Sequence, residues 1–404
     1  MRDVVKEPAA MERPELVVTL GPDDSVSDAV ALLPKRAHGT VVVIEPSSKH
    51  YYQPLWTLVG GGVVEKEETE REEASLIPDG VQWIQDAVTE FVPEASQVKT
   101  RASGIVGYDY LVVAPGIQLD WDKVKGLSTA LGHDGVCSNY SYQHVDKTWE
   151  FIRTFQGGNA IFTFPKGGVK CGGAPQKIMY LADDSFRKTG VRAASKVIYA
   201  SALPSIFAVE KYAKGLSRVI ARKEIETRFQ HNLLEVRPAS KEAVFERLDN
   251  GQEVALKYDL LHVSPPQSAP DFVKQSPLAS AAGWVDVDKY TLQHTRFPNI
   301  FALGDASSLP TSKTGAAVRA QAKILVANLA ALTNGDALSA RYDGYTSCPL
   351  VTGYGNLILA EFDYDGNPKE SFPFDQGKER YSMYLLKRYV LPQLYWQGML
   401  KGRA

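Results

Sequence analysis

The sequence is poor in cysteine, lacks a long apolar run and carries no excess of charge of either sign. Its 404 residues include 3 cysteines, which excludes a disulfide-rich scaffold, and no Cys-x-x-Cys pair is present to hold a metal. No apolar stretch approaches the roughly 20 residues that a membrane-spanning helix needs. Lys+Arg 45 against Asp+Glu 47 gives a net charge of −2, without a basic block. We therefore expect no metal site and no nucleic-acid partner.

The N-terminal segment, residues 1–14, mixes acidic and basic residues. We expect neither a secretory signal nor a transit peptide in it. The length of the chain predicts about two to three domains, with ample material for a large core.

The beginning of the chain predicts a βαβ unit that lacks the usual glycine fingerprint. Apolar strands are predicted at residues 16–20 and 41–44, and the segment 24–35 between them has helical spacing. Glu45 ends the second strand, where an acid would hold the ribose of a dinucleotide; alternatively, it only ends a buried strand. The first turn is GPDDS at residues 21–25 instead of GxGxxG, and its two aspartates would repel phosphate.

Two further strands support a bound dinucleotide. One is predicted at residues 110–114 and runs into a glycine turn at Gly116, and another precedes Gly304 and Asp305. PTSKTG at residues 310–315 then begins a predicted helix that runs to about residue 332. A helix N-terminus with Lys313 beside it is suited to stabilising the negative charge of a reduced flavin, although a solvated lysine would have the same sequence.

The most distinctive stretch is VKCGGAPQKIMY at residues 169–180, a cysteine followed by glycines just before a predicted helix. Pro175 fits the first turn of that helix because its missing N–H needs no partner there, and the helix should run to about Lys188. Cys171 then faces the positive end of the helix dipole, and two nearby lysines favour a nucleophilic thiolate. The alternative is that Cys171 is a small buried apolar residue.

The middle of the chain, about residues 150–284, predicts a second α/β unit without nucleotide-binding features. Strands are predicted at residues 160–164 and 196–201. The loop after the first strand is PKGG rather than GxGxxG, and no acid follows the second. Binding of NAD(P)H is therefore disfavoured, because the position that would hold a nicotinamide presents Cys171 instead.

From about residue 15 to its end, the chain resembles the sulfide:quinone oxidoreductases of the mitochondrial type, within the superfamily of FAD-dependent disulfide reductases. The resemblance rests on long and specific strings: EP at 45–46, HYYQPLWTLVG at 50–60, VKCGGAPQKIMY at 169–180, GD at 304–305, PTSKT at 310–314, YTSCPLVTGY at 345–354 and SFPFDQ at 371–376. The chain departs from the family at residues 20–25, where at most one fingerprint glycine remains.

The resemblance implies that the chain binds FAD. The residues implied to contact it come from two separate stretches of the sequence, before residue 120 and after residue 300: Glu45, Gln53, Val88, Gly116, Gly304, Asp305 and Lys313. It also implies that Cys171 and Cys348 form a redox pair that hydrogen sulfide attacks, leaving a cysteine persulfide, while FAD passes two electrons to ubiquinone. Hydrosulfide adds to a disulfide by thiol–disulfide exchange, and the outer sulfur then passes to a small nucleophile such as glutathione or sulfite.

The remaining candidate residues are the two cysteines as persulfide carriers, Cys137 and the histidines. The sequence does not decide which of the two cysteines carries the persulfide. Cys137 is expected to be a bystander. Of the 7 histidines, only His50 lies in a motif of the resemblance, and we expect the others to be structural residues with satisfied hydrogen bonds.

The predicted fold class is therefore α/β, with two Rossmann-like domains and a C-terminal segment. The first domain is discontinuous and comprises residues 1–150 and 285–340. The second, residues 151–284, carries Cys171. Residues 341–404 carry Cys348 and a segment that contacts the membrane and quinone.

The C-terminal residues 379–401 are apolar and aromatic, interleaved with Lys and Arg and interrupted by Pro392. This composition is typical of helices that lie in a membrane interface, and we expect a helix pair there that lines a quinone pocket together with Phe372 and Phe374. A C-terminal helix packed on the core is the alternative. By resemblance, we expect a peripheral protein of the mitochondrial inner membrane.

Two other functions stay open. One is a type II NADH:quinone dehydrogenase, against which the missing second nucleotide motif and the two cysteines argue. The other is a non-enzymatic relative that cannot hold flavin, which the Pro-Asp-Asp sequence at residues 22–24 motivates.

Overall fold

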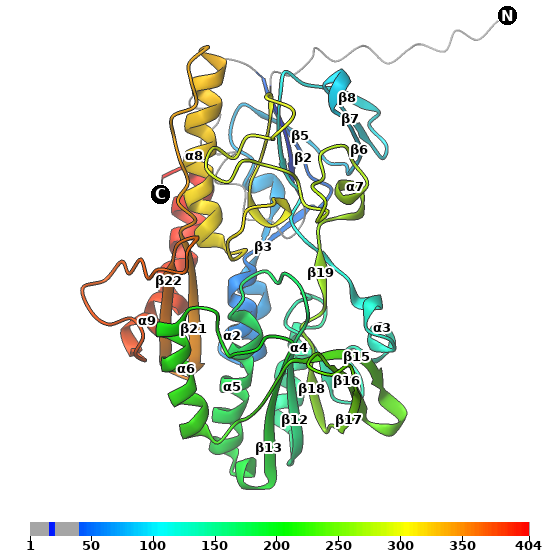
Figure 1. Cartoon of the computed structure of the whole chain (residues 1–404), viewed down its shortest axis with the longest axis vertical. Coiled ribbons are helices and arrows are strands. Elements are labelled where there is room, and N and C mark those ends of the chain that lie inside the picture. The colour runs from blue at the N-terminus through cyan, green and yellow to red at the C-terminus, as the bar shows by residue number, and fades with distance from the viewer. Residues whose placement is uncertain (1–15, 21–39, 404) are drawn as a thin grey trace, which may run out of the picture.

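The computed structural model describes residues 16–20 and 40–403. The predicted helix at residues 24–35, the turn at residues 21–25 and the N-terminal segment 1–14 lie outside the described residues. Two parallel sheets lie one above the other in Figure 1, with a β-hairpin and a C-terminal helical segment along one side.

The first sheet has five parallel strands in the order β20-β9-β1-β2-β5. These are β1 (Leu16–Leu20), β2 (Val41–Ile44), β5 (Val81–Ile84), β9 (Tyr110–Ala114) and β20 (Ile300–Ala302). Most of their residues are buried, as expected for parallel strands covered on both faces. The helix α8 (Gly315–Thr333) packs on this sheet, and the Thr314 hydroxyl caps it by accepting from the Ala317 N–H. The predicted strands and this helix are confirmed.

The second sheet also has five parallel strands, in the order β11-β18-β12-β13-β14. These are β11 (Val136–Cys137), β12 (Gly158–Phe164), β13 (Ser195–Ser201), β14 (Glu226–Phe229) and β18 (Leu260–His262). Three helices accompany them: α4 (Val145–Thr154), α5 (Ala174–Thr189) and α6 (Glu210–Lys223). Because β11 pairs with β18, the second sheet begins before residue 150, where we placed the domain boundary.

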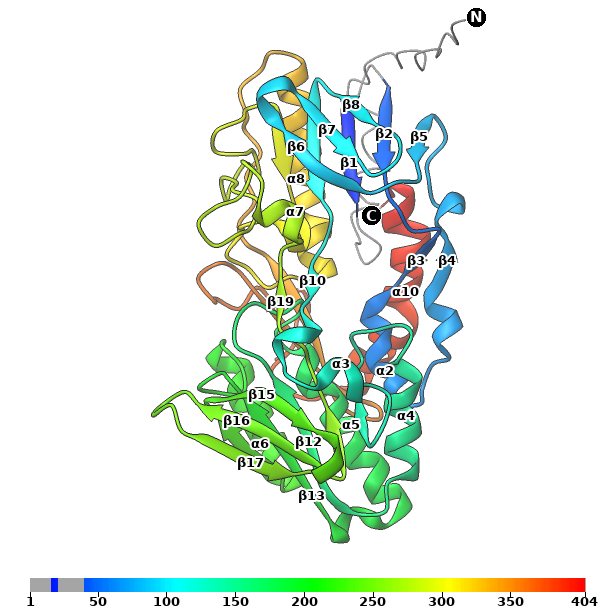
Figure 2. The ribbon, with the colours of Figure 1, turned by 90° about the vertical axis from the view of Figure 1, so that its right-hand side faces the viewer.

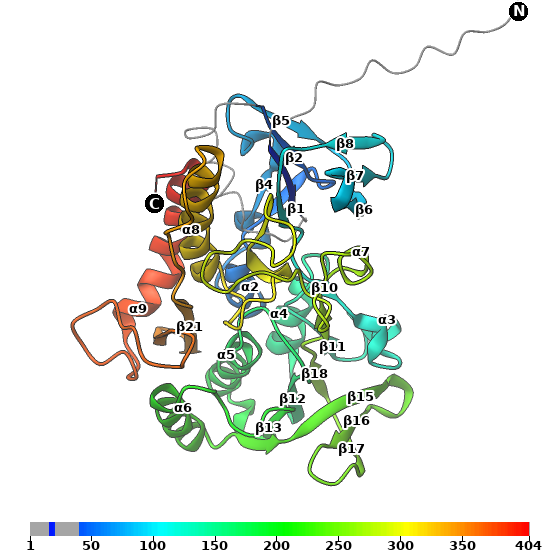
Figure 3. The same ribbon diagram turned by 45° about the horizontal axis from the view of Figure 1, so that its top comes forward.

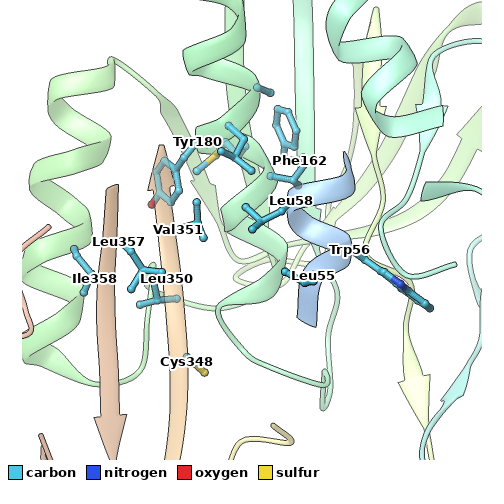
Figure 4. Packing of buried hydrophobic residues seen from close by; sticks show 14 of the residues in the cluster. Leu55, Trp56, Leu58, Phe162, Tyr180, Cys348, Leu350, Val351, Leu357 and Ile358 are labelled. Atoms are coloured by element: carbon cyan, nitrogen blue, oxygen red, sulfur yellow. The ribbon is translucent and has the colours of Figure 1, made fainter. Parts of the chain in front are cut away.

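A hairpin of β21 (Thr346–Gly353) and β22 (Asn356–Phe362) packs against α5 and brings the C-terminal part of the chain onto the second sheet's helices (Figure 1). Its strands are antiparallel, with Cys348 opposite Ala360. This packing contributes to the largest apolar cluster, in which Leu350 and Val351 lie with Tyr180 of α5 (Figure 4).

The C-terminal segment is one continuous helical run rather than the predicted helix pair. It comprises α9 (Tyr381–Leu385), η10 (Leu386–Val390), α10 (Leu391–Gln393), η11 (Leu394–Gly398) and η12 (Met399–Lys401). Pro392 does not interrupt it, because the turns on either side are wider π-helical turns, which accommodate the missing N–H. Figure 2 shows this segment beside α2 (Trp56–Gly60), β3 (Lys49–Tyr51) and β4 (Glu70–Glu72).

The remaining elements are short and connect or flank the two sheets. They are β6 (Val88–Val92), β7 (Gln97–Thr100), β8 (Ile105–Gly107), β10 (Gln118–Leu119), β15 (His231–Arg237), β16 (Glu242–Arg247), β17 (Glu253–Lys257), β19 (Gln267–Ser268), α3 (Leu127–Ala130) and α7 (Asp271–Lys274). Across residues 16–20 and 40–403, no helix combines the length and the apolar character that crossing a bilayer requires.

A buried carboxylate joins α5 to α6. Asp183 of α5 is fully buried and accepts from Arg187 Nε at 2.9 Å, Arg192 Nε at 2.5 Å and Lys223 Nζ at 3.2 Å. These cations outweigh burial and hold the pKa of Asp183 below its usual value. The carboxylate therefore stays charged in the interior, where removing it would leave several cations without their shared partner.

Asp183→Asn should lower the free energy of unfolding by roughly 3–5 kcal/mol, the usual effect of breaking a buried ion pair. Urea denaturation followed by circular dichroism measures this change. Glu210→Gln is the control, because Glu210 and its partner Lys214 are exposed, with side-chain accessibilities of 81% and 68%. A loss from Asp183→Asn no larger than that from the control would contradict the structural role of Asp183.

Candidate active site

The fold brings together two cysteines that are distant in sequence. Cys171 lies in the loop between β12 and α5, and Cys348 lies on β21 (Figure 4). Their Sγ atoms are 3.7 Å apart although 177 residues separate them. Cys348 is fully buried, whereas Cys171 is partly buried. Since a disulfide needs sulfur atoms about 2.05 Å apart, a small movement would join this pair.

Gly173, two residues after Cys171, allows this close approach. A Cβ atom there would clash with the Leu350 side chain of β21, so a larger residue would require Leu350 or the loop to move. Cys171 itself has a φ of +93°, a backbone conformation that costs a non-glycine residue of order 1–3 kcal/mol. The packing of the loop against β21 holds this strained conformation.

The helix that follows has the predicted start. It begins at Ala174, has Pro175 in its first turn, and runs to Thr189, close to the predicted end. The positive end of its dipole and its first N–H groups therefore lie next to Cys171.

Two buried lysines surround the sulfur pair. Lys177 Nζ lies 3.5 Å from Cys171 Sγ, and the side chains of Lys177 and Lys387 are almost fully buried. A hydrogen bond from the Cys348 thiol and the charges of these lysines hold the pKa of Cys171 well below its usual value, although burial opposes the shift. The hydrogen bond to Cys171 and burial raise the pKa of Cys348. Cys171 is therefore the thiolate of the pair.

Burial lowers the pKa of Lys387 to about 7, and the nearby charge of Lys177 lowers it further in the same direction. Its Nζ donates to the Pro54 carbonyl at 2.6 Å, which anchors the C-terminal segment beside α2. The sequence placed Lys387 in an interfacial tail and gave no sign of its burial.

A cavity of about 370 Å³ lies at the sulfur pair, between the two sheets and the C-terminal segment. Three of the predicted cofactor-binding residues line it, namely Gln53, Asp305 and Lys313. Lys313 Nζ donates to the Asp305 carbonyl at 2.6 Å and lies 4.0 Å from the centre of the Trp284 ring. The lysine is thus held at the N-terminus of α8, whose residues Gly315 and Ala316 also line the cavity.

The other four predicted cofactor-binding residues do not line this cavity. Glu45, Gly116 and Gly304 follow β2, β9 and β20, so they lie at the carboxyl edge of the first sheet, where open α/β sheets bind ligands. Glu45 is buried, and its Oε1 accepts from the Ser47 N–H at 2.6 Å. Val88 begins β6 and packs in the first sheet's core. The turn after β1, residues 21–25, lies outside the described residues.

Three residues that line the cavity carry buried polar atoms. Within the described parts of the chain, Asn139 Oδ1, Tyr140 OH and His262 Nδ1 have no hydrogen-bond partner, and their residues line the cavity. His262 Nε2 accepts from the Asn139 N–H at 3.0 Å, and burial lowers the pKa of His262 to about 3, so its ring is neutral. No local pattern singled out these residues, because Asn139 and Tyr140 lie in a turn after β11 and His262 ends the fully buried strand β18. The N-terminus of α8, with Lys313 beside it, gives the cavity wall N–H groups and a positive charge that suit a flavin.

Cys137 lies apart from this cavity. It is fully buried on β11, and burial raises the pKa of its thiol to about 12. A thiol of this kind is unreactive at neutral pH. Its proposed role as a bystander stays a prediction.

Two parallel five-stranded sheets with a cysteine pair and a flavin-sized cavity at their junction define the class of disulfide-reductase-like flavoproteins. No family model matches the sequence. Over 389 residues, the chain is 49% identical to "Sulfide:quinone oxidoreductase, mitochondrial" of Mus musculus, covering 96% of this chain and 86% of that one. The chain belongs to the mitochondrial sulfide:quinone oxidoreductases and is an oxidoreductase, which confirms the resemblance found in its sequence.

Two further similarities agree with this family. The protein of the same name from Dictyostelium discoideum is 52% identical over 367 residues, covering 90% of this chain and 81% of that one. The solved sulfide:quinone oxidoreductase of Aquifex aeolicus superposes with a TM-score of 0.79 at 17% identity, covering 94% of this chain and 91% of that one. At this low identity, the second similarity confirms the α/β fold alone.

Lys387→Met should raise the pKa of Cys171, because it removes a buried positive charge that favours the thiolate. Below neutral pH, alkylation of Cys171 by iodoacetamide should become about tenfold slower if the pKa rises by about one unit. Peptide mass spectrometry across a pH series measures the rate at Cys171 alone. Lys214→Met, at an exposed site, is the control, and equal pH profiles for the two variants would contradict the role of Lys387.

Proposed function

We propose that this protein oxidises hydrogen sulfide at the Cys171–Cys348 pair and delivers two electrons through FAD to ubiquinone. The observation that carries this proposal is the 3.7 Å separation of two sulfur atoms beside a cavity with buried lysines. The family of the chain supports both the sulfide and the quinone as substrates.

The residues around the cavity are suited to holding FAD. Gln53, Asp305 and Lys313 would contact its flavin half, and Glu45 with the glycine turns at Gly116 and Gly304 would contact the nucleotide half. Val88 would pack beside them. Bound FAD would supply two-electron redox chemistry between sulfur and quinone. The N-terminus of α8 and Lys313 would favour negative charge on the reduced cofactor.

The first step is thiol–disulfide exchange on the oxidised pair. Hydrosulfide attacks the sulfur of Cys348, the S–S bond breaks, and Cys171 leaves as a thiolate, so Cys348 becomes a persulfide. This direction follows because the thiol with the lower pKa is the better leaving group. Lys177 and Lys387 stabilise the released negative charge.

The second stage returns the pair to its starting state. A small nucleophile, such as sulfite or glutathione, attacks the outer sulfur of the persulfide, and Cys348 leaves as a thiolate. The two thiolates would then give two electrons to bound FAD, from which ubiquinone takes them, and form the disulfide again. The cycle as a whole removes two electrons from one sulfide sulfur.

The C-terminal segment supports access to a membrane-dissolved quinone. On one side, Leu391, Leu394 and Met399 line the cavity, and Phe372 lines it from a neighbouring loop. On the other side, large apolar side chains are exposed, with relative accessibilities of 63% for Tyr381, 59% for Tyr389 and 52% for Val390. This arrangement suits a helix that rests on a lipid surface, here that of the mitochondrial inner membrane, and admits quinone.

Cys171→Ser and Cys348→Ser should each retain the yellow flavin absorbance but reduce sulfide-driven quinone reduction to background. The reason is that each variant lacks one of the two sulfur atoms that exchange needs. Visible spectra with and without sulfide, and the rate of ubiquinone reduction, measure both properties. Cys137→Ser is the control and should keep full activity.

The spectrum also separates the competing functions. A colourless protein after reconstitution with FAD would favour a non-enzymatic relative, and bleaching by NADH but not by sulfide would favour a type II NADH:quinone dehydrogenase. Normal turnover in either active-site serine variant would remove that cysteine from the mechanism.

Tyr389→Ser combined with Val390→Ser should weaken binding to vesicles by at least about tenfold, because a buried side chain of this size contributes roughly 1.5–3 kcal/mol. Flotation with vesicles of phosphatidylcholine and cardiolipin measures the bound fraction. Ile105→Ser is a matched control, since Ile105 is 59% exposed on β8, away from this segment. Unchanged binding of the double variant would place the membrane contact elsewhere.

A further inference from the structure

Three buried side chains form a hydrogen-bonded chain that ends at the cavity. Glu73 Oε2 lies 2.9 Å from His50 Nδ1, and His50 Nε2 lies 2.5 Å from the Tyr395 hydroxyl. Their relative accessibilities are 3% for Glu73, 5% for His50 and 2% for Tyr395. The three residues come from separate parts of the chain, a short 3-10 turn, β3 and the C-terminal segment.

The two ends of this chain have different surroundings. Tyr395 lines the cavity together with Tyr52 and the apolar residues of the C-terminal segment. At the other end, both neighbours of Glu73 in sequence, Glu72 and Ala74, are exposed to solvent. The Glu73 carboxylate is buried beneath this exposed turn, from which the path to the cavity runs through the imidazole and the phenol.

Ring contacts hold the phenol in place. The Tyr395 ring centre is 4.5 Å from that of Tyr52 and 5.0 Å from that of Trp396, and the His50 ring is 5.8 Å from both Tyr395 and Trp396. The aromatic packing restrains the phenol ring of this cavity-lining residue, and its hydroxyl group is hydrogen-bonded to His50 Nε2. Aromatic packing by itself does not explain why a carboxylate and an imidazole lie in a hydrogen-bonded line with that hydroxyl group.

We propose that Glu73, His50 and Tyr395 form a proton relay that protonates the quinone during its reduction. This inference rests on the function proposed above. Quinone becomes quinol by gaining two electrons and two protons, and a hydride equivalent from the reduced cofactor supplies both electrons and one proton. The Tyr395 O–H bond breaks, and its proton forms an O–H bond on the quinone oxygen.

The relay then returns to its starting state. The Tyr395 oxygen takes a proton from His50 Nε2, and His50 takes one from solvent by way of Glu73 at Nδ1. The net reaction consumes one proton from water for each quinol formed, and no group in the relay is oxidised or reduced. The imidazole can pass a proton because each of its two nitrogens has a partner on the proton path.

Tyr395→Phe tests the relay, because it keeps the ring and removes only the hydroxyl. Enzyme reduced anaerobically with one equivalent of sulfide is mixed rapidly with a short-chain ubiquinone or with ferricyanide, which accepts electrons without protons. Quinone reduction should slow by at least about tenfold, the lower range for loss of a general acid, while ferricyanide reduction should keep its rate. His50→Gln, which leaves Tyr395 in place, should give the same selective loss.

Two readouts separate proton transfer from a structural role. Quinone binding, measured by quenching of tryptophan fluorescence, should be unchanged in Tyr395→Phe. The ¹⁵N resonance of His50 Nε2 should shift in the same variant, which reports the lost hydrogen bond without turnover. Tyr384→Phe is the matched control, since Tyr384 is a buried tyrosine of the same segment that does not line the cavity.

Quinone reduction by Tyr395→Phe within twofold of the wild type would overturn the relay. An equal loss with quinone and ferricyanide, or weaker quinone binding, would also overturn it, because either result indicates a structural role. If sulfide fails to bleach the wild-type flavin, the proposed function itself is wrong, together with the relay that rests on it. Normal wild-type turnover with an unaltered variant contradicts the relay alone.

Discussion

The packing of the 169–173 loop against β21 determines where the two sulfur atoms lie. Gly173 permits backbone and Leu350 to meet without a side chain between them, and the loop accepts a strained φ at Cys171 as a result. The same contact aligns the N-terminus of α5 with the thiolate. The stability of the fold and the reactivity of the sulfur atoms therefore depend on one interface. It lies between the 169–173 loop of the second sheet's unit and the β21–β22 hairpin, which comes much later in the chain.

The charges around that interface are unusual for an interior, because two lysines are buried beside it. A buried cation is costly unless a negative group compensates it, and the Cys171 thiolate is such a group. The lysines in turn keep the thiolate from acquiring a proton. Figure 3 shows α8 and the C-terminal segment on the same side of the molecule, and each brings a lysine to the cavity wall, Lys313 just before α8 and Lys387 in the segment.

Local signals in the sequence were sufficient for the two long helices, for four strands of the first sheet and for β12 and β13 of the second, but β5, β11, β14 and β18 were not predicted. Apolar runs, a proline in the first turn of a helix and a threonine cap each act within a few residues. They can therefore be recognised in the sequence without knowledge of tertiary contacts. The site was different. Cys171 and Cys348 could be paired only through resemblance, since 177 residues separate them. The burial of Lys387 and the bond between His50 and Tyr395 depend on contacts between distant segments, which no local pattern records.

Pro392 is a second feature whose structural effect a local sequence pattern does not predict. Proline normally ends a helix, so a break was expected at Pro392. Instead, wide π turns on either side let the helix continue. Side chains before and after the proline are held against the core, which stabilises this geometry. Residues 381–401 thus form one wall of the cavity. Because they follow both sheets in the sequence, this wall is synthesised after them, and the cavity stays open on that side until the segment docks.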